Sequence, residues 1–390
     1  MPENEDSPTP LILDIGSSTS RIGLAGEEFP EIIVMTEIAR AGDFRFKNKV
    51  IPALDSLLED FLKDPFYFGD AIHRVRDILN VERFMVTNNW TALERFLEHH
   101  FNLLAIDPQK TPMIFILPVK GGVGFSDRIQ HIMFERFNIP KIFFVPSIFC
   151  VLYALSTDSG VVISLGDRHT VIQSIFKGFE SELGSLDMDV TGERITEHLE
   201  EMISKLKVNI RLSSGELQGI KDKVALFVRD VSEALNMIEG GSTKFQHNLT
   251  LPNGINISFD KERFLSVEPY FQPSLINSSA SPLPILIADA IKQWGIAQRP
   301  ELATKIILTG GGSIIPNISE RLDYELKKIF PKIEVKIIAP SGRENLEWIG
   351  ASMLYSKDGI GDKWVLNKNW AKPLETPEDS KKDELEEAEK

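Results

Sequence analysis

The segment LILDIGSSTSRIGLAG, residues 11–26, decides the fold because it returns in altered form as VVISLGDRHTVIQSIFKG, residues 161–178. Each copy has an apolar run, a short turn of small or polar residues, and a second, alternating run. This pattern predicts a β-hairpin with an exposed tip. Asp14 and Ser164 hold the same place in the two copies, each two residues before a glycine. The repeat predicts a duplicated fold in which two similar α/β domains face each other.

The segments that follow the two hairpins have the same order. Both halves read β, β, β, α, β, α, β, α, with an extra block between residues 208 and 281 of the second half. The expected strands are 31–36, 113–119 and 141–145, then 180–190, 305–310 and 334–340, and the expected helices are 91–101, 125–137 and 148–155, then 193–206, 284–296, 315–330 and 346–355.

We expect three parts along the chain. The first domain spans 1–154, carries an insertion at about 36–70 and is completed by 346–372; the second spans 155–345, with an insertion at about 191–277; and 373–390 is an acidic flexible tail. Apolar residues on one face predict a short amphipathic helix over 50–64 in the first insertion. In the second insertion, Ser213 and Glu216 form a possible capping box that opens a long helix through Glu233.

Composition excludes several classes of protein. A hydrophobic content of 42% and a charged content of 26% are typical of globular chains rather than disordered ones. One cysteine rules out a disulfide framework and a cysteine metal cluster. The net charge of −14 comes without a basic patch, so no nucleic-acid footprint is expected. The polar, acidic N-terminus and the lack of a long uninterrupted apolar stretch favour a cytoplasmic protein without a membrane span.

Three loops are candidates for binding phosphate. Ser17, Ser18 and Thr19 at the first tip can turn backbone amides toward one point, and Gly166 and Asp167 can do so from the second tip. Arg21 would add a fixed positive charge beside them. The third loop, TGGGS at 309–313, joins a strand to a helix expected near Pro316, and its glycines let a ligand touch the backbone. For each loop the alternative is an ordinary turn or β–α connection.

Other polar residues allow two interpretations. Asp14 at a strand end suits a hydrated Mg²⁺, although aspartates also form turns. His169 can orient a water, whereas a lone histidine is more often structural. Adjacent His99 and His100 point apart on a helix, and we expect both to be solvated. No nucleophile, base and orienter set is visible.

The chain resembles the actin and actin-related protein family in segments distributed from end to end. These segments are DIGSSTSRIGLAGEEFP, YFGDAI, VTNNW, IMFERFNIP, VLYA, the GD and HT pairs of the second hairpin, IKDKV, ERFLSVEPYFQPS, LTGGGSIIPNISERL and KIIAPSGRENLEWIGASML. The pairs ERF with FQPS, and IIAP with WIG, separate this family from the related sugar kinases and heat-shock chaperones.

The resemblance implies a U-shaped molecule with ATP or ADP and Mg²⁺ in the cleft between two actin-like, ribonuclease H-like domains. Carried over position by position, the phosphates lie between Ser17, Ser18, Thr19 and Arg21 on one side and Gly166 and Asp167 on the other, with Asp14 on the water shell of the metal. Lys221 and Asp222 fall where the family contacts adenine and ribose. Gly192, Gly310, Gly311 and Gly312 line the nucleoside pocket.

The sequence departs from the family at four positions. Ser147 replaces the glutamine that positions the attacking water, and Ser164 replaces the aspartate of the second hairpin, so Ser147 and His169 form a degenerate catalytic set. Near the base, Ile315 replaces an aromatic residue and Glu344 replaces a lysine. The resemblance therefore implies that nucleotide binding is kept and hydrolysis is weakened, because hydrolysis depends on a positioned water and on charge around the metal.

Three functions remain open at this stage. The first is a cytoskeletal actin homologue that assembles into filaments, with itself or with other actin-family subunits, and binds actin-binding proteins. The second is an actin-related subunit that does not polymerise and uses its nucleotide as a clamp inside a larger complex. The third is a sugar kinase, which the family-specific segments disfavour.

Overall fold

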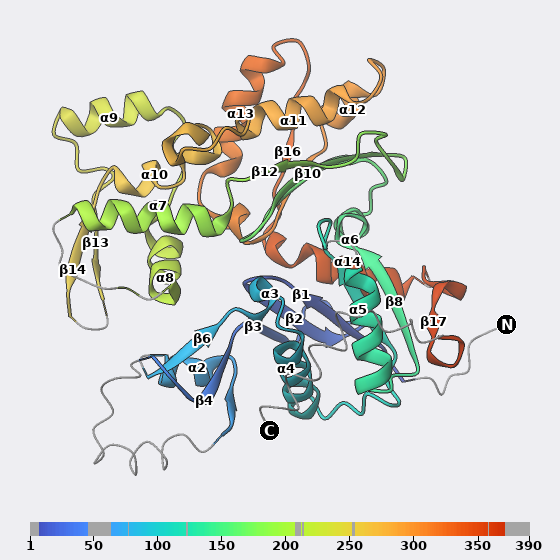
Figure 1. The fold of residues 1–390 in the computed structure, drawn as a ribbon. Coiled ribbons are helices and arrows are strands. Elements are labelled where there is room, and N and C mark those ends of the chain that lie inside the picture. The colour runs from blue at the N-terminus through green and yellow to red at the C-terminus, as the bar shows by residue number, and fades with distance from the viewer. Residues whose placement is uncertain are drawn as a thin grey trace, which may run out of the picture.

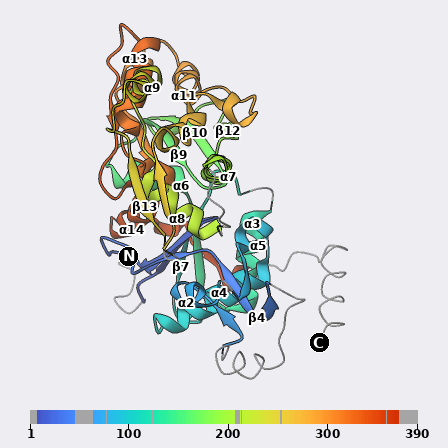
Figure 2. The same cartoon turned by 90° about the vertical axis from the view of Figure 1, so that its left-hand side faces the viewer.

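The computed structural model describes residues 8–45, 64–76, 78–121, 124–206, 212, 214–251, 254–357 and 359–370. Two six-stranded mixed sheets organise these residues, and each sheet has helices packed on it (Figure 1). We call the β1 sheet with the elements packed on it the first lobe, and the β9 sheet with its elements the second lobe. Figure 2 shows the second lobe, with α11 and α13, above the first lobe, with α2 and α4.

The sheet of the first lobe has the order β17-β8-β7-β1-β2-β3. Its hairpin, β1 and β2, is antiparallel, whereas β7 and β8 run parallel to β1 in the middle of the sheet. The strands are β1 (Leu11–Ile15), β2 (Thr19–Leu24), β3 (Ile32–Met35), β7 (Met113–Leu117), β8 (Lys141–Pro146) and β17 (Val365–Leu366). The nearly continuous burial of β1 and β7 is typical of strands covered on both faces.

The sheet of the second lobe has the order β11-β10-β9-β15-β16, and β12 also pairs with β10. Its hairpin, β9 and β10, is antiparallel, and β15 and β16 run parallel to β9. The strands are β9 (Gly160–Leu165), β10 (Thr170–Phe176), β11 (Phe179–Glu180), β12 (Leu186–Met188), β15 (Ile306–Thr309) and β16 (Ile337–Ile338).

The two sheets share one topology. In each, the first hairpin strand lies between the second hairpin strand and a parallel strand, and a second parallel strand follows at the far side. The duplicated two-lobed α/β fold expected from the hairpin repeat is therefore confirmed.

The expected helices appear in the expected order. In the first half they are α4 (Trp90–Leu103), α5 (Phe125–His131), which continues as a π-helical turn over Ile132–Arg136, and α6 (Ser147–Ala154); in the second half they are α7 (Gly192–Lys205), α11 (Leu283–Lys292), α13 (Ile318–Ile329) and α14 (Leu346–Ser356). The short helix α12 (Arg299–Ala303), between α11 and β15, was not expected. Figure 1 shows α6 and α14 between the two sheets.

Helices α6 and α14 join the lobes because each packs on the sheet of the lobe that it does not follow in sequence. Although α6 follows β8 of the first sheet, its Ile148 and Val151 pack with Val162 of β9 and Ile307 of β15. In the opposite sense, α14 follows the second sheet, and its Trp348 packs with apolar residues of β1 and β7. The two helices meet at Gly350, where an added Cβ would overlap the Cys150 carbonyl group.

Small sheets extend both lobes. The first extension pairs β4 (Ile38–Phe44) with β5 (Phe66–Tyr67) and β6 (Leu79–Glu82), covered by α2 (Asp70–Val75) and followed by the short helix α3 (Phe84–Thr87). The helix expected over 50–64 lies outside the described residues except for Asp64. The second extension holds α8 (Ser214–Val224), α9 (Val231–Glu239), the hairpin of β13 (His247–Thr250) and β14 (Asn256–Phe259), and α10 (Glu262–Leu265).

The single long helix expected through Glu233 is wrong. It divides into α8 and α9, because the chain between them packs as an extended segment in which Phe227 N donates to Pro316 O at 2.9 Å. Asp230 then begins α9 by accepting a hydrogen bond from Glu233 N at 3.0 Å.

The expectation of two solvated histidines is wrong for His100. His100 is 2% exposed, its Nδ1 lies 2.7 Å from the Phe96 carbonyl oxygen, and the two rings are 4.1 Å apart. His99 stacks on Phe68 at 4.7 Å. His100 is buried because it follows Phe96 by four residues and so shares its face of α4.

Within the described residues, no helix is long and apolar enough to cross a bilayer.

Candidate functional site

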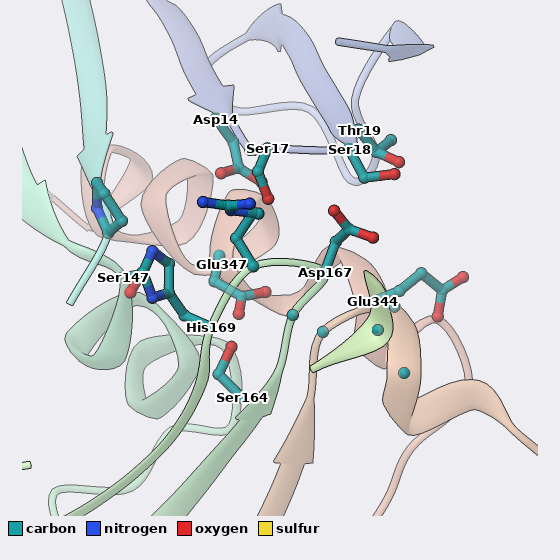
Figure 3. Close-up of a pocket in the computed structure, with 18 of the residues that line it drawn as sticks. Asp14, Ser17, Ser18, Thr19, Ser147, Ser164, Asp167, His169, Glu344 and Glu347 are labelled. Carbon is teal, nitrogen blue, oxygen red and sulfur yellow. The ribbon is translucent and has the colours of Figure 1, made fainter. Parts of the chain in front are cut away.

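A cavity of about 530 Å³ lies between the two lobes and is bordered by both hairpin tips and by the loop after β15. Every residue proposed above for catalysis, cofactor binding or metal binding lines this one cavity. They are Asp14, Ser17, Ser18, Thr19, Arg21, Ser147, Gly166, Asp167, His169, Gly192, Lys221, Asp222, Gly310, Gly311, Gly312 and Ile315. Figure 3 shows several of them directed toward a common hollow.

The two hairpin tips have the same local geometry. Gly16 N donates to Thr19 O at 3.2 Å, and Gly166 N donates to His169 O at 2.9 Å. An added Cβ would lie 2.7 Å from the Thr19 oxygen in the first tip and 2.7 Å from the His169 oxygen in the second. Only glycine allows this closure, so each lobe presents a tight tip whose backbone faces the cavity.

The third loop begins with a backbone conformation that favours glycine. Gly310 has φ +81°, and an added Cβ would lie 2.7 Å from Leu165 O of the second hairpin. The loop then forms a 3₁₀ turn over Gly311–Ile314, and α13 begins only at Ile318. The helix start expected near Pro316 is therefore slightly early, and Asn317 in the left-handed region separates the turn from the helix.

Asp14 and Arg21 form an ion pair at one end of the cavity. The Arg21 Nη1 lies 3.3 Å from Asp14 Oδ2, and Arg21 Nε donates to Asn345 Oδ1 at 2.6 Å. Burial raises the pKa of Asp14, and the charge of Arg21 acts in the opposite direction. A bound cation would favour the carboxylate further, because it adds positive charge beside Asp14.

Glu347, in the first turn of α14, is a second cavity carboxyl that sequence reasoning missed. Both of its oxygens lie 2.9 Å from Thr309 Oγ1, so the hydroxyl can donate to the carboxylate. Burial raises the pKa of Glu347 to about 7, and the negative charge of Asp14 adds to the effect. Its signal in the sequence is a lone acid within the apolar run LEWIGASML.

Lys221 and Asp222 lie together at the part of the cavity formed by α8. The Lys221 side chain is buried, and its Nζ donates to Gly192 O at 2.9 Å and to Thr196 Oγ1 at 2.7 Å. Burial lowers the pKa of Lys221 to about 8. Burial raises the pKa of Asp222, whose Oδ1 accepts a hydrogen bond from Gln218 Nε2 at 2.9 Å.

Ser147, Ser164 and His169 line the same cavity, and Figure 3 shows Ser147 and His169 on one side of the view and Asp167 and Glu344 on the other. Ser147 is the first residue of α6, and Ser164 pairs with Val171 in the β9–β10 hairpin. Burial lowers the pKa of His169. Among the described residues, no group of three or more histidine, cysteine or acidic side chains is arranged as a metal cluster.

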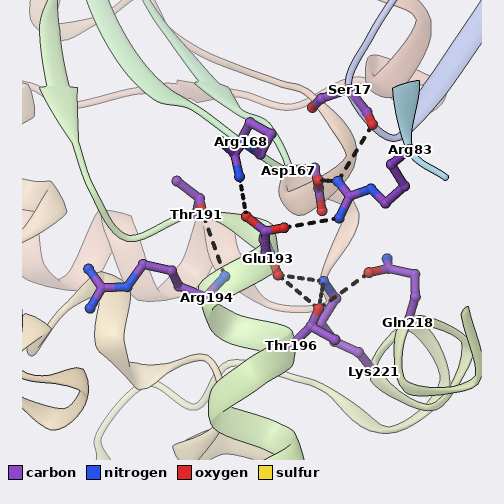
Figure 4. A network of polar contacts seen from close by, with 11 residues as sticks. Ser17, Arg83, Asp167, Arg168, Thr191, Glu193, Arg194, Thr196, Gln218 and Lys221 are labelled. Carbon is purple, nitrogen blue, oxygen red and sulfur yellow. Dashed lines mark hydrogen bonds and ion pairs between the residues drawn. The ribbon is translucent and has the colours of Figure 1, made fainter. Parts of the chain in front are cut away.

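A polar network that sequence reasoning missed connects the lobes beside the tips. Arg83, between β6 and α3, forms an ion pair with Asp167 and lies 3.2 Å from Glu193. The same guanidinium lies 3.5 Å from Ser17 O, and Arg168 Nη1 lies 2.8 Å from Glu193 Oε2. Figure 4 shows these contacts around the start of α7. Arg83 carries no recognisable motif, because its partners are 84 and 110 residues away.

The donor set fits a nucleotide and a hydrated divalent cation. Three glycine-containing loops border the cavity, nothing lies within 4 Å of a Cβ added at Gly311, and Asp14 supplies the hard oxygen ligand that Mg²⁺ prefers. A family model described as Actin matches residues 5–215 and 212–372, which is most of the chain.

Proposed function

Because the chain belongs to the actin family, we propose that it binds ATP or ADP with Mg²⁺ in the cavity between the lobes and hydrolyses the nucleotide slowly or not at all. The observation that carries the proposal is the matched pair of tips, with the same closing hydrogen bond at Gly16 and at Gly166 on opposite sides of one cavity.

In this proposal, residues of both lobes hold the phosphates and the cation. Ser17, Ser18 and Thr19 hold phosphate oxygens from the first lobe, and Gly166 and Asp167 border them from the second. Asp14 holds the hydrated cation. The cation neutralises phosphate charge, and Arg21 adds a positive charge beside Asp14.

The nucleoside lies between the second extension and the third loop in this proposal. Lys221 and Asp222 face the ribose and base, and Gly192 with Gly310, Gly311 and Gly312 lets the nucleoside approach the backbone. Ile315 and Glu344 also line the cavity, in place of an aromatic residue and a lysine at those positions of the family. The base preference is therefore tested with both ATP and GTP.

Slow hydrolysis follows from two side chains. Ser147 is too short to hold a water at the reach of the glutamine that the family carries there, and Ser164 brings no charge to the metal. Loss of one positioned catalytic group commonly costs about 10² to 10⁴ in rate. Binding depends on many backbone contacts, so it survives these changes.

We propose the cytoplasmic cytoskeleton as the site of action and assembly into filaments, alone or with other actin-family subunits and actin-binding proteins, as the activity. The alternative is a subunit of a larger complex that stays monomeric and uses nucleotide as a clamp. Ser147 and Ser164, which replace the glutamine and the aspartate of the family, favour the alternative, because a nucleotide that is hydrolysed slowly can remain bound as a clamp.

Calorimetry tests binding directly. We expect saturable binding of Mg·ATP by the wild-type chain. Gly311 lines the cavity and nothing lies within 4 Å of a Cβ added there, so Gly311→Phe should occupy ligand space without disturbing the protein, while Gly311→Ala serves as the control. Equal affinity of Gly311→Phe and wild type would place the ligand elsewhere. Absence of purine nucleotide binding by the wild-type chain would overturn the proposal.

Sedimentation with Mg·ATP separates the two functions. A pellet that appears above a threshold protein concentration supports filaments, and a soluble monomer that retains its nucleotide supports the complex subunit. Phosphate release as fast as that of conventional actin would contradict slow hydrolysis.

A further inference from the structure

We propose that Arg83 is a latch between the lobes: its guanidinium holds the first lobe against Asp167 and Glu193 of the second lobe, and this ionic contact sets how fast the nucleotide cleft opens. The proposal deepens the nucleotide binding proposed above, on which its second readout rests.

The two acidic partners of Arg83 form one rigid unit. Gly192 N donates to Gly166 O and Glu193 N donates to Asp167 O, both at 3.0 Å. These backbone bonds fix the start of α7 to the tip of the second hairpin. The backbone positions that carry Asp167 and Glu193 are therefore fixed relative to each other, and both side chains reach Arg83 of the first lobe.

Arg83 contacts both carboxylates at once. Its Nη2 pairs with Asp167 Oδ2 and its Nη1 lies 3.2 Å from Glu193 Oε1. The planar guanidinium presents several donors in a fixed geometry, which suits two acceptors better than the ammonium of lysine would. Nη2 also approaches Ser17 O, at 3.5 Å, so one side chain touches both phosphate-loop candidates (Figure 4).

Partial burial makes this contact stronger than an ordinary surface pair. The side chains of Arg83, Asp167 and Glu193 are 22%, 14% and 28% exposed. A second ion pair between the lobes, Lys120 with Asp187 at 2.8 Å, has side chains that are 40% and 51% exposed. Exposed pairs of that kind contribute little because water screens them. Arg83 is therefore the better candidate for an ionic contact that holds the lobes.

The position of the latch connects it to the ligand. Asp167 and Ser17 border the cavity, so Arg83 crosses from one lobe to the other directly beside the expected phosphates. Opening the cleft separates Arg83 from the unit of Asp167 and Glu193, and closing it re-forms the pairs. Breaking the latch should lengthen the distance between lobes and speed release of the nucleotide.

Distance measurement tests the latch without any ligand. Spin labels on Arg74→Cys of α2 and Glu200→Cys of α7 report the separation of the lobes, since both positions are exposed. The native Cys150 is buried and burial raises its thiol pKa, so the label reacts with the introduced cysteines. Arg83→Ala should shift the distances measured by electron paramagnetic resonance to longer and broader values. Glu193→Gln should shift them less, because Asp167 remains.

Arg95→Ala is the matched control, since Arg95 forms an exposed pair with Glu98 inside α4 of the first lobe. We expect its distances to equal those of wild type. If Arg83→Ala fails to fold, as judged by circular dichroism, Arg83→Gln carries the test, because glutamine removes the charge and retains much of the side-chain volume. Distances in Arg83→Ala or Arg83→Gln that superimpose on the wild-type distribution would overturn the latch.

Nucleotide dissociation is the second readout. With a fluorescent ATP analogue bound, Arg83→Ala should release it about tenfold faster or more, as expected for truncation of one partner in a partly buried charge pair. Unchanged release from Arg83→Ala would contradict a role in retention. If even the wild-type chain binds no nucleotide, the proposed function fails, while the spin-label distances still decide whether Arg83 holds the lobes.

Discussion

Asp14 and Arg21 are cross-strand partners in the first hairpin, and Arg21 Nη1 lies 3.3 Å from Asp14 Oδ2. The corresponding pair in the second hairpin is Ser164 and Val171. The duplicated fold thus keeps its geometry in both lobes, but it places a carboxylate and a cation in only one of the two hairpins. This asymmetry concentrates the expected metal chemistry on the first lobe.

Replacement of Asp14 should separate metal binding from nucleotide binding. We expect Asp14→Asn to abolish most of the gain in ATP affinity that Mg²⁺ provides, because the amide carries no charge for the hydrated cation. Affinity for ATP in excess chelator should change much less, and Asp107→Asn in an exposed loop should behave as wild type. Calorimetry with Mg²⁺ and with chelator measures both. A Mg²⁺ effect that persists in Asp14→Asn would show that another residue holds the cation.

Restoring the missing hydrolytic side chains should increase turnover. The double variant Ser147→Gln with Ser164→Asp adds a water-positioning amide and a carboxylate at two cavity positions. We expect phosphate release to rise by about tenfold or more, because each group acts on the attacking water or the charge around the metal. The control is Ser147→Gln with Ser164→Asn, which has similar side-chain volumes but lacks the added carboxylate. Equal rates for wild type and the double variant would mean that these serines do not limit hydrolysis.

Burial of His100 should make the protein less stable in acid. Burial lowers the pKa of His100 to about 4, against which its bond to the Phe96 carbonyl acts only in part. Between pH 6.5 and 4 His100 is protonated in the unfolded chain but remains neutral in the folded chain. The free energy of unfolding therefore falls as the pH drops through this interval. The loss from this group amounts to roughly 3 kcal/mol.

Urea unfolding at pH 7 and pH 4.5 measures this loss. We expect His100→Phe, which keeps an aromatic ring beside Phe96, to lose less stability between these values than wild type. His73→Phe, at an exposed position of α2, should retain the wild-type difference. An equal loss in His100→Phe would assign the acid sensitivity to other groups.

The contact of α6 with α14 should tolerate no side chain at Gly350. An added Cβ would overlap the Cys150 carbonyl group, so the helices must separate, and we expect Gly350→Ala to destabilise the protein by about 1–3 kcal/mol. Gly219→Ala in α8 is the matched control, because nothing lies within 4 Å of its added Cβ. Alanine is the better helix former, so that change should stabilise by about 0.5–1 kcal/mol. Denaturant unfolding that ranks the variants in the reverse order would contradict this packing.

Local pattern was sufficient to predict the fold. The hairpin repeat and the order of apolar segments predicted two sheets of one topology, since strand alternation and helix periodicity are encoded within a few residues. The division between α8 and α9 was missed, because the segment at Phe227 is extended through a hydrogen bond to Pro316, 89 residues away. The burial of His100 was missed because histidine is a polar residue type, although its position four residues after Phe96 places both side chains on one face of α4.

In the candidate site, too, the residues with a local sequence signal were predicted and those that depend on distant contacts were not. Tip residues such as Ser17 and Gly166 were predicted because small residues are favoured at a hairpin turn by the local backbone conformation. Glu347 and Arg83 were missed, because their roles depend on partners that are distant in the sequence. Glu347 contacts Thr309, 38 residues away, and Arg83 contacts Asp167, 84 residues away. Long-range electrostatic partners depend on how the lobes pack, and no spacing along the chain encodes them.

The amino-acid sequence by itself determined the repeated hairpins, the family segments and the residue types that border the cavity, because these follow from local backbone preference and apolar periodicity. Only the tertiary structure decided that the last helix of each half packs on the other sheet, that the charge of Glu347 acts together with that of Asp14, and that Arg83 joins the lobes. Those arrangements arise from burial and charge pairing between segments far apart in the chain, and they exist only once both sheets have formed.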